Sequence, residues 1–90
     1  MREEEKKPAM FSSNEKGFCI TFANGYSFSV QWNKLNYCDN KTWKRGKDND
    51  AKTCINAEVA YWKRDSKDMT IEGYQTPEEV SALMEKVANF

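Results

Sequence analysis

Aromatic and basic side chains stand close together in the segment NYCDNKTWKRGK, residues 36–47. Aromatic faces stack on nucleobases, and Arg and Lys side chains pair with phosphate oxygens. Asn and Asp side chains can hydrogen-bond the edge of a base or a ribose, and Gly46 lets the backbone approach an anion closely. The segment therefore favours a nucleotide or another small anionic ligand, with the contact residues Asn36, Tyr37, Asp39, Trp43, Lys44, Arg45 and Lys47. The alternative is a solvated connection in which Trp43 folds back onto the core.

The charge of this region differs from that of the whole chain. Residues 41–53 hold five basic and two acidic side chains, a local net charge of +3. Over all 90 residues, 14 basic and 14 acidic residues cancel. A chain of zero net charge has no overall electrostatic attraction to nucleic acid or to an anionic membrane surface. We therefore expect neither bulk nucleic acid nor a membrane as partner.

Catalytic chemistry has little support in the sequence. The chain has no His, which removes the usual general base and most zinc or iron sites. It carries no phosphate-binding or nucleophile motif. Glu58 and Glu72 lie on strand-like segments and resemble a carboxylate pair, but we interpret them as solvent-facing charges. We therefore predict no enzyme activity, no cofactor and no metal.

Three cysteines, Cys19, Cys38 and Cys54, lie far apart and form no C-x-x-C pair. An odd number of cysteines without a signal peptide fits a reducing cytosol. Cys19 and Cys54 fall in strand-like runs, so we expect them to be small core residues. Cys38 falls in a polar stretch, where we expect it to be exposed.

The stretch FCITFANGYSFSVQW, Phe18–Trp32, predicts a β-hairpin. A two-residue Asn24-Gly25 turn would place each apolar residue opposite a polar one. A three-residue Ala23-Asn24-Gly25 loop, with the glycine left-handed, instead pairs Phe18 with Val30 and Ile20 with Phe28. The second register makes one face wholly apolar, and burial at about 25 cal/mol per Å² outweighs the preference between turn types. We therefore predict the three-residue loop.

Further elements follow from the same patterns. Cys54–Trp62 and Met69–Tyr74 predict a third and a fourth strand, and Leu35–Cys38 extends the second strand or forms a short extra one. Thr76-Pro77-Glu78-Glu79 predicts a helix start with a capping box. Helical spacing of apolar residues places Val80, Leu83, Met84 and Val87 on one face.

The predicted fold is α+β: a four-stranded, mainly antiparallel sheet with one C-terminal amphipathic helix packed on one face. We interpret residues 1–16 as a flexible charged leader and residues 17–90 as a single small domain. The segment 33–53 is a long connection, a length that is often functional in a compact domain.

Four blocks of the sequence, ITFANGYSFSVQW, NYCDN, AEVAYW and EGYQTPEEVSALMEKVA, resemble small phage-encoded proteins over roughly residues 17–88. The resemblance implies a phage or prophage product that acts in the bacterial host cytosol. Such proteins are often non-enzymatic accessory factors. Some bind a host defence protein, and others sequester a nucleotide immune signal in a pocket shared between subunits. The resemblance assigns no binding residue.

Two functions remain open at this point. The first is a counter-defence binder that sequesters a phosphorylated, including cyclic, nucleotide signal, and the second is a protein–protein inhibitor or adaptor of the anti-CRISPR kind. The second would use exposed aromatic side chains such as Trp62 together with residues 1–16. Small chains have little core and often gain stability by association, so we expect a homo-oligomer.

Overall fold

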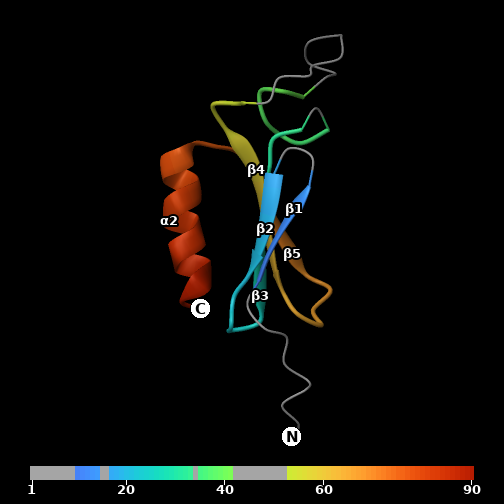
Figure 1. Cartoon of the computed structure of the whole chain (residues 1–90), viewed down its shortest axis with the longest axis vertical. Helices are drawn as coiled ribbons and strands as arrows, with labels where there is room; N and C mark the ends of the chain where they lie inside the picture. Colours follow the sequence, from blue (N-terminus) through green and yellow to red (C-terminus); the bar gives the residue numbers. More distant parts are fainter. Residues whose placement is uncertain (1–9, 15–16, 34, 42–52) are drawn as a thin grey trace, which may run out of the picture.

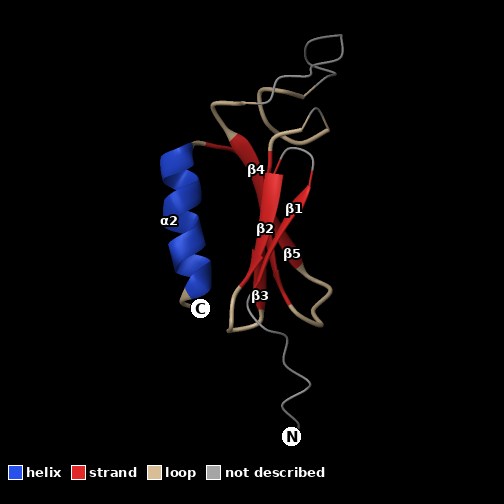
Figure 2. Ribbon diagram, in the orientation of Figure 1, coloured by secondary structure: helices blue, strands red, loops and turns tan. Residues whose placement is uncertain are grey.

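A single antiparallel sheet and one helix make up the computed structural model, which describes residues 10–14, 17–33, 35–41 and 53–90. The sheet has five strands in the order β1-β2-β3-β4-β5. Helix α2 lies along one face of the sheet and contacts β3, β4 and β5 (Figures 1 and 2). The elements are β1 Met10–Asn14, β2 Gly17–Thr21, β3 Tyr26–Gln31, β4 Ala57–Lys63, β5 Met69–Gln75 and α2 Pro77–Ala88. The α+β class with a C-terminal helix on an antiparallel sheet is confirmed.

The hairpin between β2 and β3 has the register that its apolar pattern predicts. Phe18 pairs with Val30 and Ile20 pairs with Phe28. The turn is closed by a hydrogen bond from Phe22 N to Tyr26 O at 2.8 Å and one from Gly25 N to Phe22 O at 3.0 Å. Gly25 has φ +92°, in the left-handed region that glycine enters without steric cost. The three-residue loop is therefore confirmed.

The same turn holds the C-terminal end of α2. The side-chain nitrogen of Asn24 donates to the carbonyls of Val87 and Ala88, at 3.0 and 3.2 Å. Its side-chain oxygen accepts from the backbone of Tyr26 at 2.9 Å. The last carbonyls of a helix have no partner within the helix. The bond from Asn24 therefore satisfies the Ala88 carbonyl, while the Val87 carbonyl also accepts from Phe90 N at 3.2 Å. The two Asn24 bonds also fix the position of the helix end relative to the hairpin.

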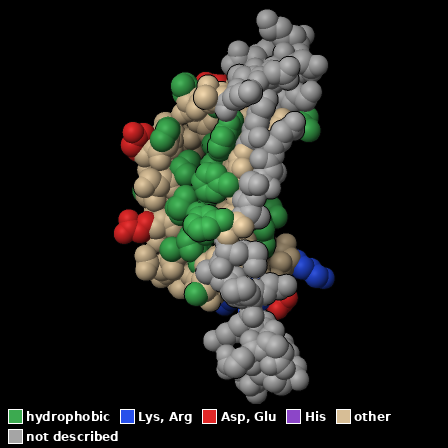
Figure 3. All heavy atoms as spheres, in the orientation of Figure 1, with side chains coloured by type: hydrophobic (Ala, Val, Ile, Leu, Met, Phe, Trp, Pro, Cys, Tyr) green, Lys and Arg blue, Asp and Glu red, His purple; other side chains and the backbone are tan. Residues whose placement is uncertain are grey.

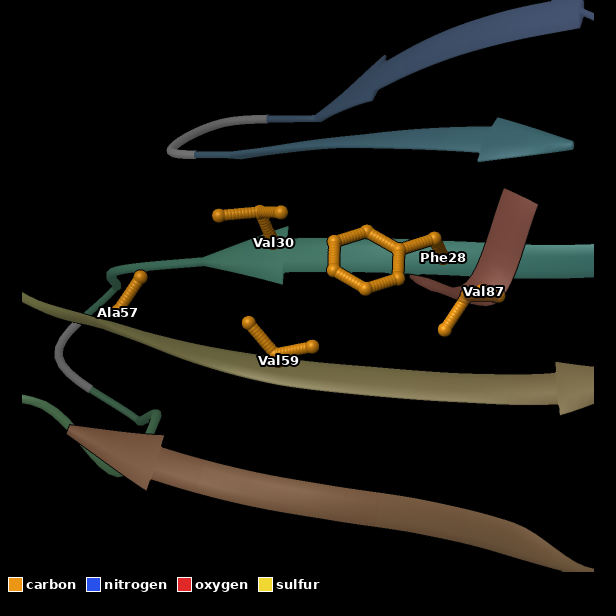
Figure 4. Close-up of a cluster of buried hydrophobic side chains, with 5 residues drawn as sticks. All are labelled: Phe28, Val30, Ala57, Val59 and Val87. Atoms are coloured by element: carbon orange, nitrogen blue, oxygen red, sulfur yellow. The ribbon is translucent and has the colours of Figure 1, made fainter. Parts of the chain in front are cut away.

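The helix begins as its sequence predicts. Thr76 is the N-cap, and its hydroxyl accepts from Glu79 N at 3.2 Å while the Glu79 carboxylate accepts from Thr76 N at 2.9 Å. Val80, Leu83 and Met84 pack against the buried core, and Val87 lies within it. Figure 4 shows how the core forms where α2 meets β3 and β4; its members are Phe28, Val30, Ala57, Val59 and Val87.

The opposite face of the hairpin carries polar side chains that bond to each other. The hydroxyls of Thr21 and Ser27 are 3.0 Å apart, and Gln31 Nε2 donates to Ser29 Oγ at 3.0 Å. Trp62 lies on this face, because it pairs with Ser27 of β3. This face is therefore polar over β2 and β3 and becomes apolar toward β4.

Two segments differ from the sequence prediction. Residues 10–14, which we placed in a flexible leader, form β1 and pair with β2, which raises the number of strands from four to five. An added strand satisfies the backbone groups that an edge strand leaves open. Residues 35–38 form turns and bends instead of a strand. The remainder of the predicted leader, residues 1–9 and 15–16, lies outside the described residues.

Gly25 provides a direct test of the turn. A Cβ added at this position meets no atom within 4 Å, so a substitution acts through the backbone alone. We expect Gly25→Ala to lower the free energy of unfolding by about 1 kcal/mol, because alanine is strained at positive φ. Gly25→Asn should lose less, since Asn tolerates this region better. Urea denaturation measures both, and an alanine variant as stable as the parent chain would contradict the assignment.

Candidate functional site

Three of the predicted ligand contacts lie in one turn, and their polar groups are largely engaged within the protein. Asn36 Oδ1 accepts from Asn33 N at 2.9 Å, and Asn36 Nδ2 donates to the Glu58 carboxylate at 3.1 Å. Asp39 N donates to Asn56 Oδ1 at 2.8 Å. The Asn36 side chain thus holds the turn in place. Both ends of its amide are engaged within the protein and do not hydrogen-bond a ligand in this arrangement.

Tyr37 is the most exposed of these three residues, with 52% of its surface accessible. Its backbone is fixed on both sides, since its N–H donates to the Glu58 carboxylate at 2.8 Å and its carbonyl accepts from Tyr74 N at 2.9 Å. The Lys41 ammonium lies 4.5 Å from the centre of the Tyr37 ring, a distance typical of a cation–π contact. The other predicted contacts, Trp43, Lys44, Arg45 and Lys47, lie outside the described residues.

Glu58 and Glu72 do not form a carboxylate pair. Glu72 is opposite Val59, whose side chain points into the core beneath the helix. Glu58 precedes Val59 in β4, and successive residues of a strand point to opposite faces. Glu58 is bound to the turn at Asn36 and Tyr37, while Glu72 is exposed. The two carboxylates therefore lie on opposite faces of the sheet, and Glu58 has a structural role.

A cleft between α2 and the sheet is a feature that the sequence did not predict. Its volume is about 470 Å³. Phe18, Val30 and Trp32 form its sheet wall, and Pro77, Val80, Ser81 and Met84 form its helix wall; Thr53–Ala57 and Gln75 complete it. Figure 3 shows hydrophobic side chains gathered beside the helix on this side of the molecule. Because α2 covers β3, β4 and β5, Phe18 of β2 remains beside it and lines the cleft.

The described walls of the cleft carry no charged side chain. Polar side chains are few among the lining residues: Thr53, Asn56, Gln75 and Ser81. Asn56 Oδ1 accepts from Asp39, whereas its Nδ2 makes no hydrogen bond within the part of the chain that the structure describes. Gln75 Nε2 donates to Gly73 O at 3.2 Å, which leaves its side-chain oxygen as an acceptor. Mostly apolar walls with a few directed polar groups are typical of small-molecule sites.

The burial of the cysteines differs from what the sequence suggested. Cys38 has no accessible surface, while Cys19 and Cys54 are half-buried and Cys54 lines the cleft. Cys38 is covered because its turn folds onto the Thr53–Asn56 stretch: Asn40 Nδ2 donates to Trp32 O at 2.9 Å and to Thr53 O at 3.2 Å. Burial raises the pKa of the Cys38 thiol to about 11. Polar neighbours in the sequence gave no indication of this long-range packing.

The described residues hold neither a candidate metal site nor a candidate membrane-spanning helix. Among these residues, no group of three or more His, Cys, Asp and Glu side chains is placed to bind a metal ion. Within the same residues, no helix has the length and apolar character needed to cross a membrane. Comparisons of the chain with protein-family models, curated proteins and solved structures found no match.

Glu58 tests the structural assignment of this turn. We expect Glu58→Ala to lower the free energy of unfolding by about 1 kcal/mol or more, because Asn36 and Tyr37 lose their shared acceptor. Glu58→Gln retains an acceptor oxygen and should lose less. Glu72→Ala, at an exposed position, is the matched control and should remain near the parent stability. Thermal and urea denaturation measure the series; equal stability of the two alanine variants would contradict the assignment.

Proposed function

We propose that the protein is a non-enzymatic binding protein that holds a phosphorylated nucleotide with the base in the cleft between α2 and the sheet. The observation that carries this proposal is the cleft itself, whose volume of about 470 Å³ lies within the range of small-molecule sites. A nucleobase has two flat faces that favour apolar or aromatic contacts and an edge that needs hydrogen bonds. The walls of the cleft offer both.

The two kinds of contact come from different walls. Phe18 and Trp32 supply aromatic surface from the sheet, and Met84 supplies a polarisable side chain from the helix. Stacking of a base on an aromatic side chain contributes about 1–3 kcal/mol in single-stranded nucleic-acid complexes. Asn56 Nδ2 and the side-chain oxygen of Gln75 offer a donor and an acceptor for the edge of the base. This arrangement supports a base-sized, uncharged group as the part of the ligand that enters.

The phosphates are expected at the wall of the cleft formed by Thr53–Ala57, opposite the helix wall. Glu78 and Glu79 lie in the first turn of α2, and their charges repel an anion there. Thr53 lies in the opposite wall and is the point at which the basic segment 41–53 rejoins the described chain. We therefore retain Lys44, Arg45 and Lys47 as proposed phosphate contacts on the basis of their charge in the sequence.

The biological role that we propose is sequestration of a nucleotide signal. Binding alone is sufficient for such a role, and Glu58, the acidic side chain beside the predicted loop, is engaged in structural hydrogen bonds. The resemblance to small phage-encoded accessory proteins supports a counter-defence setting for this binding. A homo-oligomer in the host cytosol remains part of the same proposal.

Calorimetric titration with cyclic and linear nucleotides tests the proposal. We expect at least one nucleotide to bind, and we expect Ser81→Trp to weaken it at least tenfold by filling the cleft from the helix wall. Ala82→Trp is the matched control, because Ala82 is the next residue of α2, is equally exposed and lies toward β5 and away from the cleft. No heat with any nucleotide, or equal loss in both variants, would contradict the proposal.

A second candidate function, binding of a partner protein, is favoured by the exposed edge of the sheet at β5. Met69 and Ile71 are 53% and 51% accessible, and they share a face with Trp62 and Ala60, their partners in β4. β5 is the last strand of the sheet, so among the described residues its outer edge has no neighbouring strand. Such an edge can accept an extended strand of a partner, with pockets for alternate side chains.

A charged substitution on the apolar face of β5 tests this second candidate. Ile71→Lys places a charge among the apolar side chains, whereas Thr70→Lys, one residue away on the other face, is the matched control. We expect a partner purified from bacterial lysate to bind the isolated protein, with at least tenfold weaker affinity for Ile71→Lys alone. Equal affinities would rule out this edge as the binding surface. Light scattering on the free chain distinguishes a second copy from a foreign partner.

A further inference from the structure

Two cysteines that are distant in sequence lie close to each other beside the cleft. The backbone N–H of Asp39, the residue after Cys38, and the thiol of Cys54 donate to the same oxygen, Asn56 Oδ1. The Cys38 thiol donates to Asn33 O at 3.6 Å. The Cys54 thiol donates to Asn56 Oδ1 at 3.7 Å. Cys54 is partly accessible, whereas Cys38 has no accessible surface. The pair therefore has one thiol that a reagent can reach and one that it cannot.

The backbone on either side of this pair is tightly connected. Asp39, the residue after Cys38, donates its N–H to Asn56 Oδ1 at 2.8 Å. Asn40, which is buried, donates to the carbonyl of Thr53, the residue before Cys54, at 3.2 Å. These contacts flank both cysteines and hold the two backbone segments that carry them together in the folded chain.

We propose that Cys38 and Cys54 are an oxidisable pair, which a low-molecular-weight disulfide such as oxidised glutathione converts into an intrachain disulfide. The bond would close the chain from residue 38 to residue 54 into a covalent loop at the wall of the cleft. This modification site does not depend on the proposed nucleotide binding. Its formation and its reversal by a reducing agent can be measured in the absence of any ligand.

The reaction proceeds by two exchange steps. The accessible Cys54 thiolate attacks one sulfur of oxidised glutathione, which forms a mixed disulfide and releases one glutathione thiolate. The Cys38 thiolate then attacks the Cys54 sulfur and releases the second glutathione. The two protein thiols lose two electrons in total, glutathione disulfide gains them, and the two protons pass to the released thiolates. Because burial raises the pKa of Cys38 to about 11, the second step is slow at neutral pH and faster as the pH rises.

Mass spectrometry of the full chain after incubation with oxidised glutathione tests the proposal. We expect a transient glutathione adduct followed by a product that has lost two hydrogen atoms, with a peptide map that joins Cys38 to Cys54. Cys19 should remain free to react with an alkylating agent. The midpoint of thermal unfolding should rise by at least ~5 °C in the oxidised chain, because the crosslink restricts the unfolded state. Dithiothreitol should reverse both changes.

Variants separate this pair from general oxidation. Cys54→Ser should abolish the intrachain product, and Cys38→Ser should leave the chain as a stable glutathione adduct. Cys19→Ser is the control and should oxidise as the parent chain does. Cys38 is buried, and its substitution can unfold the chain. The peptide map of the unsubstituted protein therefore shows, without any variant, whether Cys38 and Cys54 are joined. A crosslink through Cys19, a persistent adduct alone, or no reaction would overturn the proposal.

Discussion

The turn at Ala23–Gly25 is the constraint on which the rest of the structure depends. Gly25 takes a left-handed conformation, and this closes a three-residue loop that sets the register of β2 and β3. A shift of one residue would exchange the two faces of a strand. Asn24 of the same turn donates to the final carbonyls of α2. One turn therefore decides both which face of the hairpin is apolar and where the helix that covers it ends.

The cleft follows from a difference in width between the helix and the sheet. One helix packs over three strands of a five-stranded sheet, so it cannot cover every apolar side chain of the hairpin. Phe18 and Trp32 pack against the edge of the core and also face the cleft. Apolar surface left open in this way is costly for a small domain, and it is retained most readily where a ligand or partner covers it. This cost is the physical reason to regard the cleft as functional.

Several predictions from the sequence were wrong because contacts with other segments decided the structure. Cys38 was expected at the surface, residues 35–38 in a strand, and residues 10–14 in a leader. In the first two cases the decisive contact is distant in sequence, whereas in the third it is a hairpin with the next strand. Asn40 reaches Thr53, Asn36 and Tyr37 share the carboxylate of Glu58, and β1 pairs with β2. Polar side chains that serve as internal hydrogen-bond partners look the same in sequence as those that face water.

The sequence by itself determined the hairpin register, the start of the helix and the apolar stripe of the helix, because each depends on residues close together in the chain. Glycine at a left-handed position, a capping box and a periodic apolar pattern are local and physically strong signals. Only the tertiary structure decided that Asn24 would hold the end of α2, that the segments carrying Cys38 and Cys54 would lie together, and that a cleft would open beside β2. These features depend on the distance between separate elements, which no spacing within the sequence specifies.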